Sequence, residues 1–239
     1  MKGVAPDGSP VDVYRALPLA GEDELVARVV APPATVLDLG SGPGRIAHAL
    51  VRRGYAVTAV DDSAEMLSHV QGAETVLADV AELRLRRRFD CVLLASHFVN
   101  DADHVRRRAV LETCARHVHE DGVVLVEAYP PSLDWEASVG RPRRLGDVVV
   151  TVVDANVDGD DVDATVVYEL EGETWRQPFT AQMLDEADLR RELDAVGLRF
   201  ERWLARERGW FTAIPRTPRD IGGGGQEGTE GSPKFANPD

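Results

Sequence analysis

The sequence has little cysteine, little lysine and no long apolar run, and each scarcity excludes a class of protein. Only Cys91 and Cys114 are present, so neither a disulfide framework nor a cysteine metal site is indicated. No apolar run approaches the roughly 18 residues of a membrane-spanning helix, and the N-terminus, with its early Pro and Asp residues, lacks the apolar stretch of a secretory signal. We therefore expect a cytoplasmic protein with no membrane partner.

Basic residues are also outnumbered. The chain has 239 residues, with 27 Lys and Arg against 41 Asp and Glu, for a formal net charge of -14. This balance argues against a nucleic-acid partner, because such affinity depends on cations that neutralise phosphates. The basic runs at 84–88 and 106–108 are interpreted as solvated faces. Lys2 and Lys234 are the only lysines, a bias typical of a GC-rich bacterial genome, and we expect a small-molecule substrate.

Residues 36–45, Val-Leu-Asp-Leu-Gly-Ser-Gly-Pro-Gly-Arg, are the most informative segment. Their apolar, β-branched start is typical of a central parallel strand. Three alternate glycines, Gly40, Gly42 and Gly44, then let the backbone turn tightly and pass close to a ligand. Apolar residues recur at helical spacing from Ile46 onwards. The segment predicts a strand, a glycine turn and a helix, which together form a nucleotide-binding unit.

The glycine spacing separates classes of nucleotide. It reads G-x-G-x-G, whereas a dinucleotide fingerprint is G-x-G-x-x-G, and Arg45 stands where the third glycine would be. Arg45 is interpreted as an exposed helix residue without a chemical role. The segment has no P-loop lysine for a triphosphate. Asp38 ends an otherwise apolar strand, where burying a carboxylate is costly unless it meets donors or a cation. A ligand that carries an ammonium group would supply one.

These residues resemble the first motif of the class I S-adenosylmethionine-dependent methyltransferases of small-molecule type, an acid followed by G-x-G-x-G. The resemblance extends over residues 36–128 in the family's order and spacing. It implies an α/β, Rossmann-like, doubly wound sheet of seven strands, mostly parallel with an antiparallel last strand. It also implies S-adenosyl-L-methionine as the cofactor, S-adenosyl-L-homocysteine as the product, and methyl transfer to O, N or C of a small acceptor such as a secondary-metabolite intermediate.

The resemblance assigns the cofactor to the ends of successive strands. Asp61, after the strand at 56–60, matches the acid that accepts hydrogen bonds from both ribose hydroxyls. Asp79 matches the acid that bonds the adenine amino group, and the N–H of Val80 would meet the ring. Asp62 and Glu65 form a D-x-x-E pattern that predicts a helix-capping box. The remaining positions assigned to the cofactor are Asp38, Gly40, Ser41, Gly42, Gly44, Asp62, Met66, Ser96 and Tyr14.

The strand at 89–95 resembles the family's fourth strand, so the residues after it are expected at the mouth of the site. His97 is the candidate general base, since a neutral imidazole titrates in the useful range. The alternatives are a hydrogen-bonding substrate contact or a packed residue. Aromatic rings offer large contact areas to small ligands, although they could equally form core. The candidate acceptor-binding residues are His97, Phe98, Asn100, Tyr129, Trp135 and Trp175.

The second half departs from a bare cofactor domain. Strand patterns at 148–153, 162–170 and 174–179 predict a small antiparallel β insert at about 130–180 of a domain spanning 1–216. Residues 217–239, rich in Gly and Pro, predict a disordered tail. Residues 154–159 match the first half of an EF-hand loop. Their flanks resemble strands and position twelve is Thr165, so we expect an acidic hairpin turn there and no metal site.

Two other functional classes stay open beside the methyltransferase. An NAD-dependent Rossmann oxidoreductase is opposed by the glycine spacing. A non-catalytic, methyltransferase-like binding subunit would keep the acids at the strand ends without turnover. A homodimer is retained as a candidate assembly.

Overall fold

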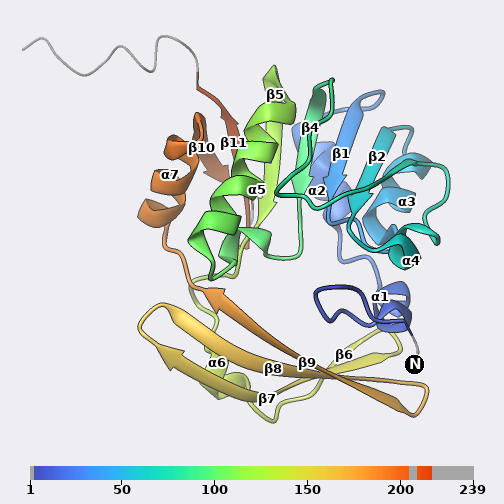
Figure 1. The fold of residues 1–239 in the computed structure, drawn as a ribbon, viewed down its shortest axis with the longest axis vertical. Coiled ribbons are helices and arrows are strands. Elements are labelled where there is room, and N and C mark those ends of the chain that lie inside the picture. Colours follow the sequence, from blue (N-terminus) through green and yellow to red (C-terminus); the bar gives the residue numbers. More distant parts are fainter. Residues whose placement is uncertain (1–2, 205–208, 217–239) are drawn as a thin grey trace, which may run out of the picture.

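The larger part of the computed structural model, which describes residues 3–204 and 209–216, is built on a central sheet of seven strands (Figure 1). The strand order is β10-β11-β5-β4-β1-β2-β3. The strands from β1 to β5 pair in parallel, and β11 pairs antiparallel with both β5 and β10. This arrangement confirms the predicted fold class. The bounds are β1 Thr35–Leu39, β2 Ala56–Asp61, β3 Glu74–Leu77, β4 Phe89–Leu94, β5 Val118–Glu127, β10 Leu198–Trp203 and β11 Trp210–Pro215.

Helices cover both faces of this sheet, which explains why its central strands are almost wholly apolar. On one face, Leu37 and Leu39 of β1 join a core with α5 (His104–His117) and α7 (Glu186–Ala195). On the other face, Val36 joins a core with α2 (Glu22–Val29) and α3 (Arg45–Arg52). Asp38 has the same parity as Val36 and is the polar exception in the strand. Cys91 and Cys114 are free and buried in these cores.

The helix starts follow local capping chemistry, with one correction. The Asp103 carboxylate accepts the N–H of Val105 at 2.9 Å and caps the start of α5. The predicted capping box of Asp62 and Glu65 is wrong, because α4 (Ala64–Leu67) is capped instead by Ser63, whose Oγ accepts the N–H of Met66 at 3.2 Å. Ser63 is held in place by its own N–H bond to Asp61 Oδ1.

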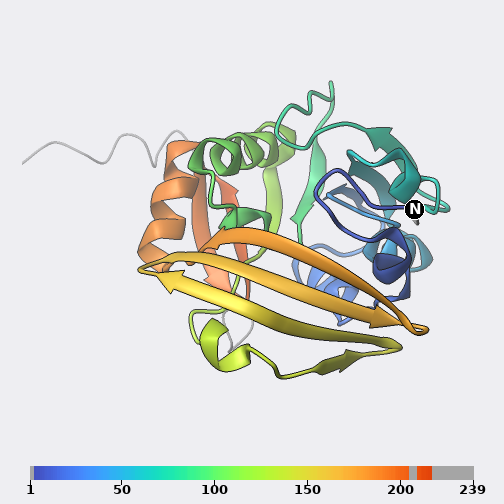
Figure 2. The same ribbon diagram turned by 60° about the horizontal axis from the view of Figure 1, so that its bottom comes forward.

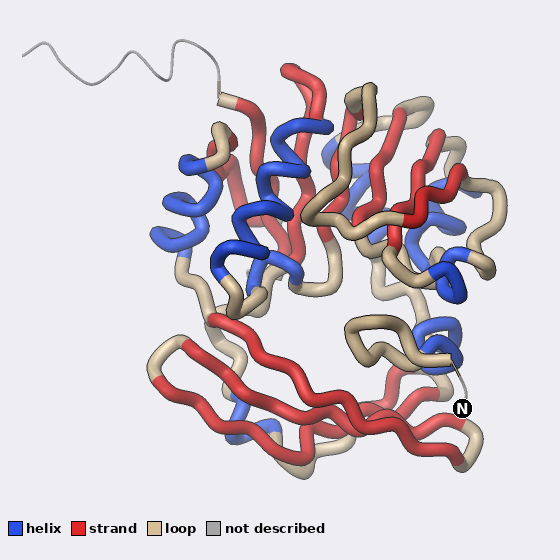
Figure 3. The backbone as a smooth tube through the Cα atoms, viewed as in Figure 1, coloured by secondary structure: helices blue, strands red, loops and turns tan. Residues whose placement is uncertain are grey.

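A second sheet of four antiparallel strands lies across the carboxyl ends of the central strands (Figures 2 and 3). It comprises β6 (Arg143–Leu145), β7 (Val148–Asp158), β8 (Asp161–Leu170) and β9 (Glu173–Gln182), with α6 (Trp135–Ser138) packed on β7. This is the predicted insert, with longer strands than the sequence indicated. Residues 154–159 lie in β7 and the β7–β8 turn, where Gly159 has φ 62°, as the acidic-hairpin interpretation predicted.

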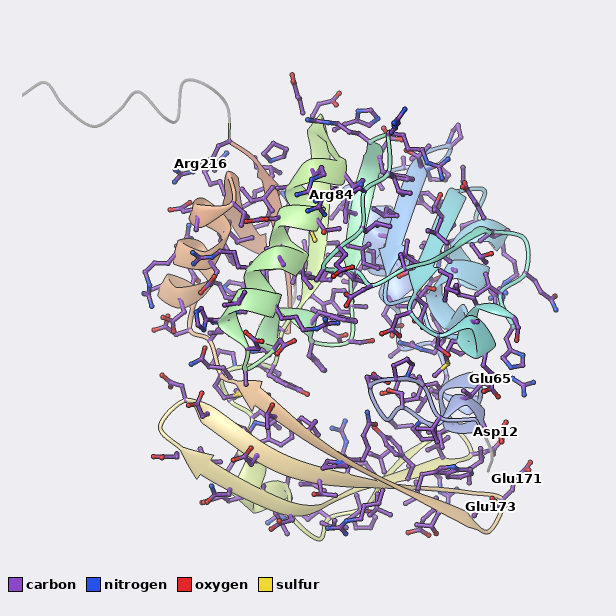
Figure 4. All side chains as sticks on the ribbon, viewed as in Figure 1. Asp12, Glu65, Arg84, Glu171, Glu173 and Arg216 are labelled. Atoms are coloured by element: carbon purple, nitrogen blue, oxygen red, sulfur yellow. The ribbon has the colours of Figure 1, made fainter. Side chains whose placement is uncertain are left out.

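The N-terminal segment lies between the two sheets (Figure 1). Its loop leads into α1 (Val11–Ala16), which contacts β8. Gln177 of β9 donates to the carbonyl oxygen of Asp7 at 3.4 Å and to Ser9 Oγ at 3.2 Å. The tip of the β8–β9 hairpin, marked by Glu171 and Glu173, lies on the α1 side of the molecule (Figure 4). The segment therefore closes one end of the space between the sheets.

No helix in residues 3–204 and 209–216 is long and apolar enough to cross a membrane. The predicted tail at 217–239 lies outside the described residues.

Candidate active site

A cavity of about 600 Å³ lies where the carboxyl ends of the central strands face the second sheet. Its volume is typical of a small-molecule site. The lining comes from the glycine turn, the ends of β2, β4 and β5, the N-terminal segment, and β8 and β9. A second hollow of about 590 Å³ is also lined by Trp135. Its carboxylates at Asp134 and Asp185 are occupied as helix caps, and those at Glu136 and Asp160 are exposed to solvent. The chemistry therefore concentrates in the first cavity.

The glycine turn shapes one wall. Gly40, Gly42 and Gly44 have φ of 69°, 54° and 88°, a region that other residues rarely adopt. A Cβ on Gly40 would lie 2.4 Å from the Phe98 ring, whereas a Cβ on Gly42 would meet nothing within 4 Å. Gly44 packs instead against His48 of α3. The first glycine thus permits close packing, and the second leaves open space beside the backbone.

Asp38 is a buried carboxyl group without enough partners. Its side chain lines the cavity at 1% exposure, and Oδ2 has no hydrogen-bond partner among the described residues. Burial raises its pKa to about 7, although the positive charge of Arg45 opposes the rise. The nearby Ser41 Oγ is likewise unpartnered within the described chain. Buried polar groups are nearly always hydrogen-bonded, so these atoms fit a donor-bearing ligand.

Asp61 ends β2 as predicted and organises the turn beside it. Its Oδ2 accepts the N–H of Gly42 at 2.8 Å, and its Oδ1 accepts the N–H of Ser63 at 2.9 Å. A carboxylate has about four acceptor sites, so two remain for a ligand's hydroxyl groups. Burial raises the pKa of Asp61, while the two backbone hydrogen bonds oppose the rise. Asp62 and Met66 line the cavity beside it.

Asp79 lies two residues beyond β3, and its carboxylate is engaged by the protein. Oδ2 accepts from Arg106 Nη1 at 2.9 Å, and Oδ1 accepts the N–H of Ala81 at 2.8 Å. Burial opposes the charge, yet the Arg106 hydrogen bond holds the pKa of Asp79 below its usual range. Val80 and Arg106 line the cavity here. The adenine contact assigned to Asp79 stays a prediction.

The rim after β4 is strained. Ser96 and His97 have φ of 58° and 59°, a conformation that costs roughly 1–3 kcal/mol for each non-glycine residue. The Ser96 N–H donates to Glu127 Oε2 at 2.7 Å, which anchors the turn to the end of β5. Strain at such a position is held by surrounding structure and clusters at functional sites. The short helix η1 (Phe98–Asn100) follows directly.

An aromatic stack continues from His97 into the second sheet. The His97 ring lies 3.9 Å from the Tyr129 ring at 25°, and Tyr129 meets Trp135 edge-on at 4.9 Å. Trp135 in turn lies 5.6 Å from Phe179 of β9. Burial lowers the pKa of His97 to about 4, so its imidazole is neutral at pH 7. Its Nδ1 is buried without a partner in the described structure.

Asn100 connects this rim to both sheets. Its Oδ1 accepts the N–H of Tyr129 at 2.9 Å, and its Nδ2 donates to the carbonyl oxygen of Gln182 at 2.8 Å. Asp101 forms an isolated antiparallel bridge with Ala181 of β9. The acceptor-side wall is therefore fixed by hydrogen bonds that join η1, the end of β5 and the end of β9.

The structure brings most of the predicted residues to this cavity. Trp175, Gly44 and Asp79 are not among the described residues that line it; Trp175 faces Tyr168 across β8 and β9. The predicted residues that do line it are Asp38, Gly40, Ser41, Gly42, Asp61, Asp62, Met66, Val80, Ser96, Tyr14, His97, Phe98, Asn100, Tyr129 and Trp135.

Sequence reasoning missed several wall residues. Glu127 ends an apolar parallel strand, so the argument used for Asp38 would have found it. Tyr168 and Phe179 gave no signal, because strand alternation does not say which face of the second sheet is covered. Arg45 was expected to be exposed and without a role. It is half-buried, lines the cavity and bonds Glu22 and the carbonyl oxygen of Pro18.

Residues 36–122 match the model of the methyltransferase domain family. The chain contains a class I S-adenosylmethionine-dependent methyltransferase domain. Its match covers β1 to the middle of β5, which is the part of the fold that carries the glycine turn and the strand-end acids. No curated protein matches the chain in sequence.

Solved methyltransferase structures share the fold over most of the chain. The CcbJ methyltransferase from Streptomyces caelestis is 19% identical, with a TM-score of 0.70 over 87% of this chain and 96% of that chain. The sugar N-methyltransferase KedS8 from Streptoalloteichus sp. is 22% identical, with a TM-score of 0.66 over 83% and 88%. The amino pentose methyltransferase CalS10 from Micromonospora echinaspora is 19% identical, with a TM-score of 0.62 over 86% and 91%. These likenesses extend the methyltransferase fold beyond residues 36–122.

Proposed function

We propose that this methyltransferase carries a methyl group from S-adenosylmethionine to a small-molecule acceptor bound between the His97 rim and the second sheet. The observation that carries the proposal is the combination of an unpartnered buried carboxyl group, Asp38, with a glycine turn that opens onto the same cavity. The buried carboxyl group suits the amino-acid end of this cofactor, and the open space beside the glycine turn suits its nucleoside end.

The residues present fit that cofactor. Asp38 and Ser41 offer unpartnered buried oxygens, which suit the ammonium group of its methionine part. Asp61 keeps acceptor capacity for the ribose hydroxyls after binding Gly42 and Ser63. Val80 lies on the wall where the adenine would rest. We assign Asp38, Asp61 and Val80 to hold the methionine, ribose and adenine parts in that order.

Catalysis by this chain rests on placement. When bound, the cofactor supplies a methyl group already activated by a positive sulfur. The protein's own contribution is to hold the acceptor in line with that methyl and to exclude water, and well-oriented groups gain several kcal/mol from this placement alone. The aromatic stack of His97, Tyr129 and Trp135 supplies the acceptor wall, and the second sheet covers it. His97 is neutral and contributes as a contact in this stack.

The acceptor is a small molecule in this proposal. The cavity of about 600 Å³ must hold both the cofactor and the acceptor, which favours a compact acceptor. KedS8 is a sugar N-methyltransferase and CalS10 an amino pentose methyltransferase, and both share the fold. We extend small-molecule methylation to this chain from that likeness. A cytoplasmic location agrees with the free Cys91 and Cys114, and a homodimer stays a prediction for sedimentation analysis.

Calorimetry tests the cofactor half of the proposal. We expect binding of S-adenosylmethionine and S-adenosylhomocysteine and none of NAD. Asp61→Ala removes the charged acceptor of the ribose hydroxyls, and the loss of one such hydrogen bond, about 1.5–3 kcal/mol, already lowers the affinity for the sulfur nucleotides roughly tenfold to a hundredfold. Asp121→Ala, at an exposed position of β5, is the matched control and should bind like the unaltered protein. Absence of binding by either sulfur nucleotide would contradict the proposal, and NAD binding would favour the oxidoreductase.

A further inference from the structure

Glu127 lies at the acceptor end of the cavity. Along the sheet the order is β2, β1, β4 and β5, and Asp61 ends β2 whereas Glu127 ends β5. Three strand spacings of about 4.8 Å place the ends of these two strands roughly 14 Å apart. Asp38, in β1, lies between them in this order. Glu127 is therefore beyond the positions proposed for the ribose and the methionine ammonium, and it neighbours the aromatic stack instead.

The Glu127 side chain is held but not neutralised. Oε2 accepts the N–H of Ser96 at 2.7 Å, and Oε1 lies 4.0 Å from His97 Nε2. Its side chain is 24% exposed and lines the cavity. No described Arg or Lys side chain forms an ion pair with it. One carboxylate oxygen is thus fixed by the backbone, and the other faces the acceptor wall beside a neutral imidazole.

The two arginines of the cavity wall are already committed elsewhere. Arg45 bonds the carboxylate of Glu22, whose side chain is 8% exposed. Arg106 bonds Asp79 at 2.9 Å and lies 3.5 Å from Asp101. Burial raises the pKa of Glu127 to about 7, with Glu22 adding to the rise while the Ser96 hydrogen bond and Arg45 oppose it. The local field at Glu127 therefore favours the arrival of a cation.

We propose that Glu127 receives an ammonium group of the acceptor and accepts its proton, which makes the acceptor an amine. This inference rests on the proposed function and names the atom that is methylated. One N–H bond of the ammonium breaks and its proton passes to Glu127 Oε1. The freed lone pair forms the new N–C bond to the methyl carbon as the C–S bond breaks, and that electron pair stays on sulfur. The products are an N-methylated ammonium, the thioether nucleoside and a protonated Glu127, which loses its proton to solvent.

A hydroxyl acceptor fits this site less well. An alkylammonium ionises near the reference value for lysine, about 10.4, roughly three units above a carboxyl group of pKa about 7. A hydroxyl group lies nearer the value for water, about 15.7, far from a matched proton transfer. A hydroxyl also carries no charge to offset the buried carboxylate. The Glu127 carboxylate therefore favours an amine over a hydroxyl acceptor both by its charge and by the smaller difference in pKa.

Calorimetry with a matched pair of probes tests the inference. Phenethylamine and 2-phenylethanol share the aromatic body that Tyr129 and Trp135 would contact, and differ in the ammonium. On protein saturated with S-adenosylhomocysteine we expect the amine to bind at least tenfold more tightly than the alcohol. Glu127→Gln should remove that preference and leave the affinity for the alcohol within about twofold of that of the unaltered protein. Gln keeps an oxygen for the Ser96 N–H, so a purely structural role would leave the preference intact.

Controls keep the outcomes separate. Glu120→Gln removes an exposed carboxylate on the same strand and should behave like the unaltered protein. Equal binding of the two probes by the unaltered protein, absence of amine binding, or an unchanged preference in Glu127→Gln would each overturn the inference. The first two outcomes are measured on the unaltered protein, so a folding defect of a variant cannot explain them. Failure of the proposed function shows separately, as loss of S-adenosylhomocysteine binding by the unaltered protein.

Discussion

Replacing Asn100 by alanine should loosen the second sheet from the central sheet. Asn100 is 1% exposed, and its amide bonds both the Tyr129 N–H and the Gln182 carbonyl oxygen. Alanine would leave that donor and that acceptor without a partner, at a cost of about 1–3 kcal/mol each. Both bonds are part-buried, so water can partly replace the amide, and we expect a loss of about 2–4 kcal/mol. For a domain of this size that is a fall in Tm of roughly 4–16 °C.

The same variant separates the two halves of the site. Asp38 and Asp61 lie on β1 and β2, away from Asn100, so S-adenosylhomocysteine affinity should stay within about threefold. Binding of an acceptor probe should fall at least tenfold, because the Tyr129 ring loses its anchor. Thermal melting by circular dichroism and calorimetry measure the two quantities, with the exposed Asn156→Ala as control. A loss of stability under 0.5 kcal/mol, or an equal loss of affinity for S-adenosylhomocysteine and for the acceptor probe, would refute this account of the rim.

Two further predictions concern the cofactor half. Gly42→Ala has space for its Cβ but an unfavourable φ of 54°, so it should lower the folding stability by about 1 kcal/mol. Its effect on S-adenosylmethionine binding should be much larger than that. Thermal melting and calorimetry measure the two effects, and an unchanged affinity would contradict the geometry. The pKa of Asp38 is raised from 3.8 to about 7, so its effect lowers the stability of the ligand-free protein as pH rises from about 4 to 7. In urea unfolding, the free energy of unfolding of Asp38→Asn should fall less over that pH interval than that of the unaltered protein. Parallel plots of this free energy against pH for the two proteins would contradict the prediction.

The cofactor half of the site was predictable because its signals are local. A strand that ends in an acid and alternate glycines has few structural interpretations, and Asp38, Gly40 and Gly42 lie where the sequence placed them. The mostly parallel sheet of seven strands with an antiparallel last strand followed from the family resemblance, and its strand order came from the structure. Glu127 obeyed the same rule as Asp38, an acid at the end of an apolar strand, and was passed over because no glycine turn follows it.

The acceptor half was less predictable because it depends on contacts between distant segments. Tyr168 and Phe179 reach the cavity only because the second sheet turns that face toward the central strands, and alternation alone cannot choose the face. Asn100 gained its role from the carbonyl oxygen of Gln182, 82 residues along the chain. Arg45 was misjudged since its partner Glu22 precedes the first strand. The capping error at Asp62 came from a competing side-chain bond at Asp61.

The electrostatics of the cavity explain why two carboxyl groups are kept at a cost. Both wall arginines are paired with acids, Arg45 with Glu22 and Arg106 with Asp79 and Asp101. Asp38 and Glu127 are left with raised pKa values and no described ion pair with Arg or Lys. Buried carboxylates are favourable only when a cation or donors reach them. A cationic group beside each of these two carboxyl groups would relieve both costs, and a methyl transfer between two ammonium-bearing molecules would supply two such groups.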